Sequence, residues 1–254
     1  METKDPFIVY PLGACTFALY SRQRQDFSLK AAPDSSFPEA YKRLCDFLKN
    51  KDIFDVAESG LFFPEQVHGS ALARADLSDS AQNGKKLLRI LPGVDGLITD
   101  SPGMALAMLS ADCLPLSIYD PVHNAIGIAH AGWRGTHLGI ASALLDLMRK
   151  DFGSEPNSIK ALLGPAIRKC CYKVDKQRAE FFDGHVVLSE SGYLLDIVGA
   201  NIAQLKDKGV RADNIHDSGV CTCCDAADSF SFRREGEGCG RMVSLVISGK
   251  GVSR

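Results

Sequence analysis

Three residues that lie far apart in the sequence carry side chains that bind metal ions in many proteins. His68 precedes a glycine, Cys113 stands between two apolar runs, and His130 ends a third apolar run. Two imidazoles and one thiolate suit zinc, and three protein ligands leave a fourth position open, as in catalytic zinc sites. Copper is the alternative, because a given ligand set generally binds Cu²⁺ more tightly than Zn²⁺. We therefore expect one mononuclear metal site, most simply a zinc site that acts on a small molecule.

Each of these residues has a plainer interpretation when it is considered alone. A single histidine beside a glycine is more often a hydrogen-bonded loop residue, and a free cysteine is commonly a small buried apolar residue. Asp112, next to Cys113, weakens that second interpretation, since a carboxylate among apolar residues needs a cation, a donor or a metal. Asp112 is therefore a candidate catalytic proton carrier, or a carboxylate that only orients a ligand. Cys113 would be catalytic if the protein were a cysteine hydrolase, with His68 or His130 as its base.

The segment HAGWRGT at residues 130–136 is the strongest local signal. It places an imidazole, the only tryptophan, a guanidinium and two glycines between a predicted strand and a predicted helix. Backbone N–H groups and the helix dipole favour an anion at such a turn. Arg134 is therefore our first candidate for a catalytic and substrate-binding residue that holds a phosphate or a ribose oxygen. Arg233 and Arg241 are secondary substrate-binding candidates.

The elements that must position these residues are mostly short strands. Apolar segments bounded by Gly, Pro or Asp predict strands at residues 7–10, 87–91, 96–99, 104–109, 114–119, 125–130, 159–163 and 243–247. Helical spacing predicts helices at 38–48, at 137–151 between a Thr136 cap and Gly153, at 174–182, and at 193–208 before Gly209. Short connections between strands favour antiparallel or mixed pairing over a doubly wound parallel sheet. The pattern predicts a layered, mixed α/β (α+β) fold.

The composition narrows the class of protein and of partner. A chain of 254 residues with 45% hydrophobic side chains can fold as one domain, and we expect a single domain over residues 1–254. Lys and Arg total 29 against 31 Asp and Glu, which argues against nucleic acid or an anionic membrane as a partner. The first residues lack the pattern of a signal peptide, so we expect a cytoplasmic protein. The nine cysteines are then reduced thiols or metal ligands rather than a disulfide framework.

Taken together, these segments closely resemble the laccase-domain family, also called the YfiH-like or multicopper polyphenol oxidoreductase family. The matching segments are EQVHG (65–69), DGLITDSPG (95–103), ADCLPL (111–116), HAGWRGT (130–136), LGPAIRKCCYKV (163–174), SFSFRR (229–234) and GR (240–241). They occur in order over most of the chain, and HAGWRGT is the most specific of them. One departure is the segment YSRQRQ at residues 20–25, which lacks the glycine-rich turn that family members usually carry there.

The resemblance implies both a fold and an activity. It implies a four-layer α/β/β/α sandwich with mixed sheets, of the kind shared with certain toxin deamidase domains. It implies that His68, Cys113 and His130 hold one zinc ion, and that Cys171 or Tyr172 contacts the substrate's base. The implied enzyme is a purine nucleoside phosphorylase with adenosine deaminase activity. Adenosine, inosine, guanosine or methylthioadenosine would react with phosphate to give the free base and ribose 1-phosphate.

Two further metal hypotheses follow from the residue counts. Copper-dependent polyphenol oxidation is the older family description, and it needs several copper ions. Binding several coppers takes more than the six histidines present here, and it takes paired His-x-His motifs, which this sequence lacks. Cys221, Cys223, Cys224 and Cys239 carry enough sulfur for a second, structural zinc, but only one or two of them match the family pattern. The sequence therefore favours a single ion. The remaining histidines, at 123, 137, 185 and 216, are expected to be ordinary surface or helix residues.

Overall fold

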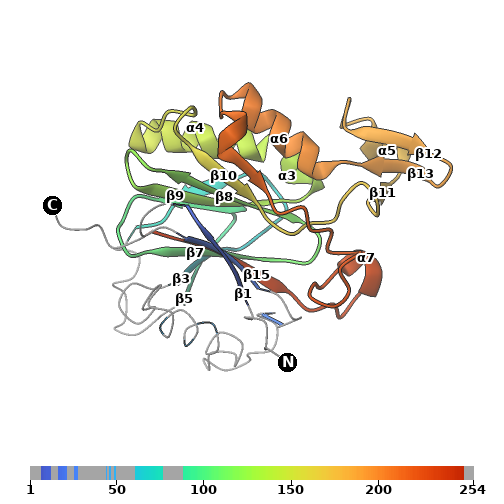
Figure 1. Cartoon of the computed structure of the whole chain (residues 1–254), viewed down its shortest axis with the longest axis horizontal. Helices are drawn as coiled ribbons and strands as arrows, with labels where there is room; N and C mark the ends of the chain where they lie inside the picture. Colours follow the sequence, from blue (N-terminus) through green and yellow to red (C-terminus); the bar gives the residue numbers. More distant parts are fainter. Residues whose placement is uncertain are drawn as a thin grey trace.

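Two β-sheets packed face to face form the centre of the molecule. The computed structural model describes residues 7–12, 17–21, 26–27, 44, 46, 49, 61–76 and 88–248. Within these residues, helices α4 (Ile140–Phe152) and α6 (Ile197–Asp207) cover the outer face of one of the two six-stranded sheets (Figure 1). The described residues thus form a helix layer, a sheet and a second sheet. The predicted class, a layered mixed α/β fold, is confirmed.

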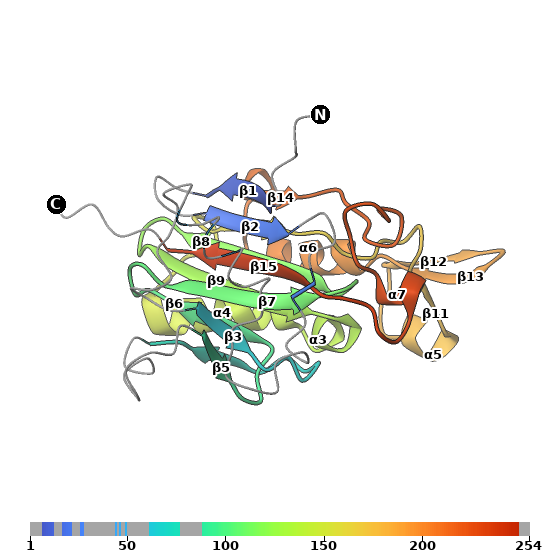
Figure 2. The same ribbon diagram turned by 90° about the horizontal axis from the view of Figure 1, so that it is seen from below.

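The other six-stranded sheet contains both parallel and antiparallel pairs. Its strands lie in the order β1 (Phe7–Pro11), β2 (Phe17–Ser21), β15 (Met242–Ile247), β7 (Ala105–Ser110), β3 (Leu61–Pro64) and β5 (Leu88–Leu91). Figure 2 shows them side by side. The neighbours from β1 to β7 are antiparallel, whereas β3 runs parallel to both β7 and β5. Four consecutive residues of β3 are buried, so this strand carries no polar face.

The helix-covered sheet contains the two longest strands. Its order is β14 (Ile215–Asp217), β10 (Lys160–Leu163), β8 (Leu114–Asp120), β9 (Ala125–Ala131), β6 (Gly96–Thr99) and β4 (Leu72–Arg74). All seven residues of β8 and all seven of β9 are buried, because the helices cover one face of this sheet and the other sheet covers the second. This two-sided burial explains why both strands read as apolar runs without alternation.

The connection between β7 and β8 differs from the expected pairing of successive strands. β7 pairs with β15 and β3, while β8 pairs with β9 and β10 in the other sheet. Residues 111–113 therefore carry the chain from one sheet to the other instead of forming a hairpin. Cys113 lies in this crossover, directly before the first residue of β8.

All eight predicted strands are present, with ends within one residue of the prediction, but the helices differ. The helix predicted at 137–151 is α4, which starts three residues later; a separate short helix, α3 (Trp133–His137), precedes it, and Gly139, with a left-handed φ of +79°, separates the two. Thr136 lies inside α3 and does not cap α4, although α4 ends on Gly153 as predicted. The start of the helix predicted at 193–208 is instead strand β13 (Gly192–Leu195). The helix predicted at 38–48 lies largely outside the described residues.

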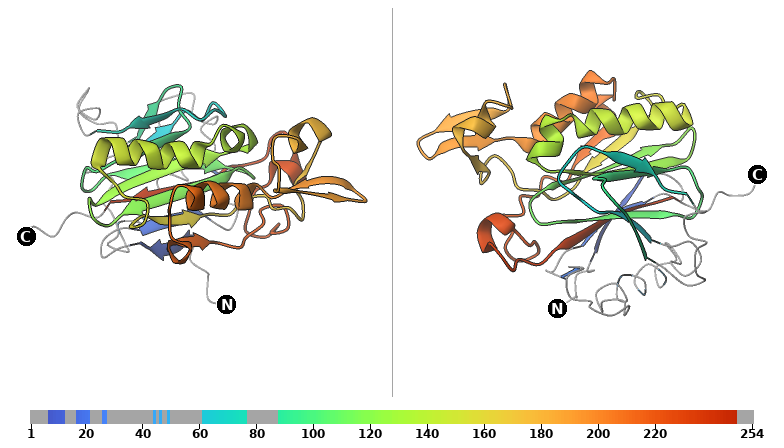
Figure 3. Two further views of the ribbon diagram at one scale, coloured as in Figure 1. Left: turned by 90° about the horizontal axis from the view of Figure 1, so that it is seen from above. Right: turned by 180° about the vertical axis from the view of Figure 1, so that it is seen from behind.

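A small third sheet projects from one end of the molecule and was not predicted. Strands β11 (Lys173–Val174), β13 and β12 (Val186–Ser189) form it, together with the short helix α5 (Lys176–Ala179) (Figure 3). α5 is much shorter than the helix predicted at 174–182. The remaining short elements are the 3₁₀ turn η3 (Ala212–Asn214) and α7 (Phe232–Glu235). Among the described residues, no helix has the length and apolar character needed to cross a bilayer.

Candidate metal centre

The structure brings together the three residues that the sequence suggested as metal ligands. His68 lies in the loop after β3, Cys113 in the crossover between the sheets, and His130 near the end of β9. One ligand atom from each lies within 4.8 Å of the other two. The two imidazole rings meet edge to face, with centroids 4.8 Å apart and an angle of 88° between their planes. His130 is buried and His68 is exposed, so the group is open to solvent on one side.

Asp95 fixes two of the three ligands and was not recognised from the sequence. Its Oδ1 lies 3.0 Å from Nδ1 of His130 and accepts the backbone N–H of His68 at 2.9 Å. Its Oδ2 accepts the N–H of Gly69 at 2.7 Å. Because Nδ1 of His130 is engaged, Nε2 is the ring nitrogen left for a metal. These hydrogen bonds outweigh the effect of burial and lower the pKa of Asp95, which keeps the carboxylate charged.

Cys113 and His130 stabilise each other's charged forms. Burial alone would raise the pKa of the Cys113 thiol, but the charge of His130 and hydrogen bonds from both imidazoles lower it to about 6. Burial alone would lower the pKa of His130, but the charge of Cys113 and the contact with Asp95 raise it to about 9. A thiolate is the form of cysteine that binds metals. The chain therefore supplies the deprotonated ligand near neutral pH.

The loop that carries His68 is held in an unusual backbone conformation. Gln66 and His68 have left-handed φ angles of 64° and 62°, which cost energy for residues other than glycine. The amide of Gln66 compensates by donating to the carbonyl of Leu109 at 2.6 Å and accepting its N–H at 2.8 Å. This pair of bonds ties the loop to the end of β7, two residues before the crossover begins.

Two glycines of HAGWRGT allow the segments around the site to approach closely. A Cβ atom on Gly135 would lie 2.6 Å from the carbonyl oxygen of Gly69, in the loop of His68. A Cβ atom on Gly132 would lie 3.1 Å from Sγ of Cys113. Contacts below 3.0 Å to a backbone oxygen require the backbone to move. The glycines therefore bring α3 and the loop of His68 into direct contact.

Asp112 is buried, and protein groups bind both of its carboxylate oxygens. Oδ1 accepts the hydroxyl of Thr222 at 2.7 Å, and Oδ2 accepts the backbone N–H of Arg233 at 2.7 Å. Asp112 also has a left-handed φ of 94°. Its carboxylate thus joins the crossover to two segments more than 100 residues later in the chain. Thr222, like Asp95, was not recognised from the sequence.

The three candidate arginines have different surroundings. The exposed guanidinium of Arg134 lies over the ring of Trp133, 5.2 Å from its centroid. Arg233 lies over the ring of Tyr172 at 5.4 Å and donates to the carbonyl of Lys173. Arg241 donates to the carbonyls of Cys239 and Gly240. Of the three, Arg233 is the one whose backbone N–H donates a hydrogen bond to Asp112.

Tyr172 lies close to the metal centre, whereas Cys171 belongs to a different group. Burial raises the pKa of Tyr172, and the nearby charge of Cys113 raises it further. The thiol of Cys171 faces Cys224, with their sulfur atoms 3.3 Å apart. Of the two residues expected to contact a base, Tyr172 is therefore the one within electrostatic reach of the ligand Cys113.

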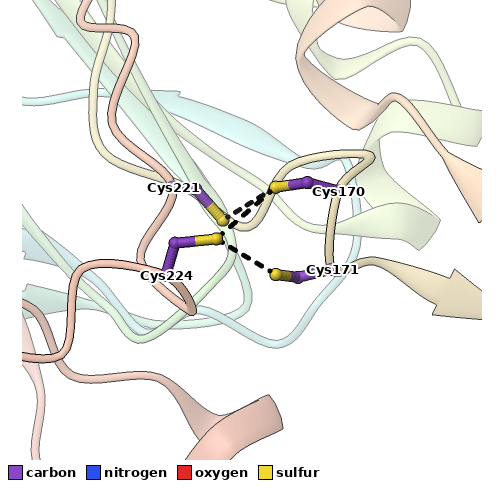
Figure 4. Close-up of side chains that lie close together, drawn as sticks. All are labelled: Cys170, Cys171, Cys221 and Cys224. Carbon is purple, nitrogen blue, oxygen red and sulfur yellow. Dashed lines mark hydrogen bonds between the residues drawn. The ribbon is translucent and has the colours of Figure 1, made fainter.

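The second cysteine group differs in membership from the one the sequence suggested. Cys170 and Cys171 join Cys221 and Cys224 (Figure 4). Cys239 is instead buried beside Phe230 and Met242, outside this group. Cys223 is not one of the four, although its side chain contacts that of Cys171. Sequence distance hid the pairing, because the two halves of the group are about fifty residues apart.

The other four histidines make structural contacts, as expected. Nδ1 of His123 lies 2.7 Å from the carboxylate of Asp120, and the ring of His137 packs against Phe181. The ring of His216 packs against Tyr10, and the backbone N–H of His185 donates to Phe182.

Known proteins are similar to this chain over most of its length. It is 37% identical over 191 residues, 72% of this chain and 70% of the other, to a protein of Geobacillus stearothermophilus named purine nucleoside phosphorylase YlmD. It is 33% identical over 195 residues, 73% of this chain and 74% of the other, to adenosine deaminase RL5 of an unknown prokaryotic organism. The crystal structure of YlmD from Geobacillus stearothermophilus matches with a TM-score of 0.85 and 29% identity, covering 98% of each chain. The family model described as multi-copper polyphenol oxidoreductase laccase matches residues 41–249, and the chain belongs to this family.

Proposed function

We propose that this protein is a zinc-dependent purine nucleoside phosphorylase that also deaminates adenosine. The observation that carries the proposal is the group of His68, Cys113 and His130, oriented by the buried Asp95. The names of the similar proteins, purine nucleoside phosphorylase and adenosine deaminase, support the same activities. The proposed substrates are adenosine, inosine, guanosine and methylthioadenosine, with inorganic phosphate as the second substrate.

The residues of the site fit a zinc ion. Two imidazoles and a thiolate form a borderline-soft donor set, and three protein ligands are typical of catalytic zinc. The carboxylate of Asp95 on the far ring nitrogen of His130 is the arrangement that commonly orients a zinc-bound histidine. An ion held there would supply a Lewis acid at its open fourth position.

The surrounding side chains suggest how a nucleoside and phosphate would be held. In phosphorolysis a phosphate oxygen bonds to the anomeric carbon while the bond to the base breaks, and the leaving base takes up a proton. Arg134 and Arg233 are exposed cations that can bind the phosphate. Tyr172, whose ring lies against the guanidinium of Arg233, is the proposed contact for the base. Asp112 accepts from both Thr222 and Arg233, so its proposed role is to position the backbone of Arg233.

The test uses the full chain loaded with zinc. Inosine and phosphate should give hypoxanthine and ribose 1-phosphate, and adenosine should also give inosine and ammonia. His130→Ala should lose both activities, whereas His216→Ala, a histidine outside the group, should retain them. Undiminished turnover by His130→Ala, or no turnover of any of the four nucleosides by zinc-loaded protein, would refute the proposal.

Cysteine hydrolysis is a second candidate, because one contact pattern favours it. The thiol of Cys113, the imidazole of His130 and the carboxylate of Asp95 follow one another as in a cysteine–histidine–carboxylate triad. This candidate predicts that the metal-free protein hydrolyses its substrate and that an amide-derived electrophile labels Cys113. It would be excluded if the isolated protein held a firmly bound zinc at His68, Cys113 and His130 and lost its activity when a chelator removed that zinc.

Oxidation by several coppers is not supported by the arrangement of the histidines. All six histidines lie within the described residues, and there only His68 and His130 share a group of potential ligands. Multi-copper oxidation needs more imidazoles than one such pair offers. The family description therefore does not carry over to a multi-copper activity of this chain, and copper is an alternative only as a single ion at the first site.

A further inference from the structure

Four cysteine side chains converge at a place remote in sequence from the first metal group. Cys170 and Cys171 lie in the turn between β10 and β11, and Cys221 and Cys224 lie in the loop between β14 and α7. All four sulfur atoms lie within 4.8 Å of one another. In Figure 4 the two cysteines of each loop point toward those of the other.

The spacing of the sulfur atoms fits a single tetrahedral ion. The separations are 3.5 Å for Cys170–Cys221, 3.7 Å for Cys170–Cys224 and 3.3 Å for Cys171–Cys224. Covalent disulfides would require about 2.05 Å. A zinc ion with Zn–S bonds of about 2.3 Å at the centre of a tetrahedron separates its sulfur ligands by about 3.8 Å. A cluster of several irons would spread its thiolates over a wider polyhedron.

We propose that Cys170, Cys171, Cys221 and Cys224 bind a second, structural zinc ion. Four thiolates complete the coordination of zinc and leave no position for a substrate, which is typical of structural sites. Cys221 and Cys224 have the Cys-x-x-Cys spacing common in such sites. The adjacent pair is presented by a tight turn, in which the N–H groups of Cys171 and Tyr172 both donate to the carbonyl of Arg168 at 2.8 Å.

The backbone already joins the two loops beside the cysteines. Ala166 and Cys221 form a parallel β-bridge, in which Thr222 donates to the carbonyl of Ala166 at 3.1 Å. Arg168 also donates to the carbonyl of Val220 at 3.1 Å and forms an ion pair with Asp217. The two loops are therefore held at the distance the ion requires before it binds.

The proposed ion would act on the first site through Thr222. This residue lies between Cys221 and Cys224, and its hydroxyl donates to the carboxylate of Asp112, the neighbour of Cys113. Its carbonyl accepts a hydrogen bond from Arg234. An ion that fixes the loop at Cys221 and Cys224 thus holds Thr222 against Asp112 without touching a substrate. The role of the cysteine site is therefore to position Thr222 and, through it, Asp112 beside the catalytic centre.

The decisive experiment is elemental analysis of the full chain, purified with a reductant and dialysed against a weak chelator. Wild-type protein should retain two zinc ions per chain, and Cys224→Ser should retain one. The matched control is Cys239→Ser, which changes a buried thiol outside the group and should retain both. Cys170→Ser, at an exposed position, is the second variant if Cys224→Ser does not fold.

Replacement of zinc by cobalt assigns the lost ion to one site. The absorption of tetrahedral cobalt bound by four thiolates should be present in wild type and in His130→Ala, and absent in Cys224→Ser. This result does not depend on nucleoside turnover, so the second site and the proposed activity can fail separately. One zinc per chain in wild type and in Cys224→Ser alike, or two disulfides among the four cysteines of the reduced preparation, would overturn the proposal.

Discussion

At the scale of single residues, Asp95 determines the geometry of the metal centre. Its carboxylate accepts the backbone of His68 and Gly69 and binds the ring of His130. Asp95→Asn keeps the size of the side chain but replaces one acceptor oxygen by a donor. Zinc affinity should fall about 10- to 100-fold, as for other carboxylates that orient a metal-bound histidine. Competition with a chromophoric chelator measures it. Asp100→Asn, at a surface acid paired with Arg74, is the control, and equal affinities in the two variants would contradict the role of Asp95.

The charge of Cys113 can be followed by its reactivity in metal-free protein. A pKa of about 6 means that the thiolate, the form that iodoacetamide alkylates, predominates above that pH. The labelling rate should therefore reach half of its maximum near pH 6. His130→Ala removes the strongest interaction that lowers this pKa and leaves the burial, so the midpoint should move to higher pH. Peptide mapping separates Cys113 from the other cysteines. The same midpoint in both proteins would show that His130 does not stabilise the thiolate.

The residue types in the sequence indicated the candidate metal ligands, but not the side chains that hold those ligands and their neighbours in place. His68, Cys113 and His130 were candidates because few side chains bind zinc, and because Cys113 and His130 adjoin apolar runs while His68 precedes a glycine. Asp95 lies in the segment DGLITDSPG, but its role depends on a contact with a histidine 35 positions away. Thr222 is 110 positions from Asp112. Local pattern carries no information on such contacts.

At the scale of elements, Gly135 decides how closely α3 approaches the loop of His68. A methyl group there would lie 2.6 Å from the carbonyl oxygen of Gly69, and neither backbone can yield easily. Gly135→Ala should lower the free energy of unfolding by about 1–3 kcal/mol, as overpacking does elsewhere. It should also weaken zinc binding, because the displaced loop carries a ligand. Urea unfolding and chelator competition measure the two effects.

The control for Gly135→Ala lies on the other side of the same contact. A Cβ atom on Gly69 would meet its nearest neighbour, Oδ2 of Asp95, at 3.5 Å, which is ordinary van der Waals contact. Gly69→Ala should therefore change stability little. Equal losses in both variants would mean that the close approach at Gly135 is not the cause.

Eight of the strands were predictable, whereas the strands of the third sheet and the helix boundaries were not, for physical reasons. A strand such as β9 is buried on both faces, so its apolar run ends where the burial ends. The break at Gly139 arises from one left-handed residue inside an otherwise helical pattern. The sequence predicts residues 193–195 as the first turn of a helix, because Tyr193 and Leu194 suit a helix or a strand. In the structure these residues pair with β12 and β11, and this pairing makes them strand β13.

At the scale of the whole molecule, the sequence indicated layers but not which strands share a sheet. β7 and β8 are consecutive and separated by three residues, yet they belong to different sheets. β7 instead pairs with β15, more than 130 residues later in the chain. Such long-range pairing is decided by the packing of the two sheets on each other. The crossover it creates is the place where the metal ligands meet.

Because the ligands come from both sheets, zinc should stabilise the molecule as a whole. His68 follows β3 in one sheet, His130 belongs to β9 in the other, and Cys113 lies between them. An ion bound there joins the two sheets and binds only the folded arrangement of the three ligands, so it contributes to the free energy of global unfolding. At a free zinc concentration about 100 times the dissociation constant, this gain should be about 2.7 kcal/mol, reduced by any binding to the unfolded chain.

Urea unfolding with and without zinc measures this gain in stability. His68→Ala removes an exposed ligand and should abolish the share of the gain that comes from this site without preventing folding, whereas His216→Ala should keep it. If His68→Ala gains as much stability from zinc as wild type does, the ion does not join the two sheets through this residue.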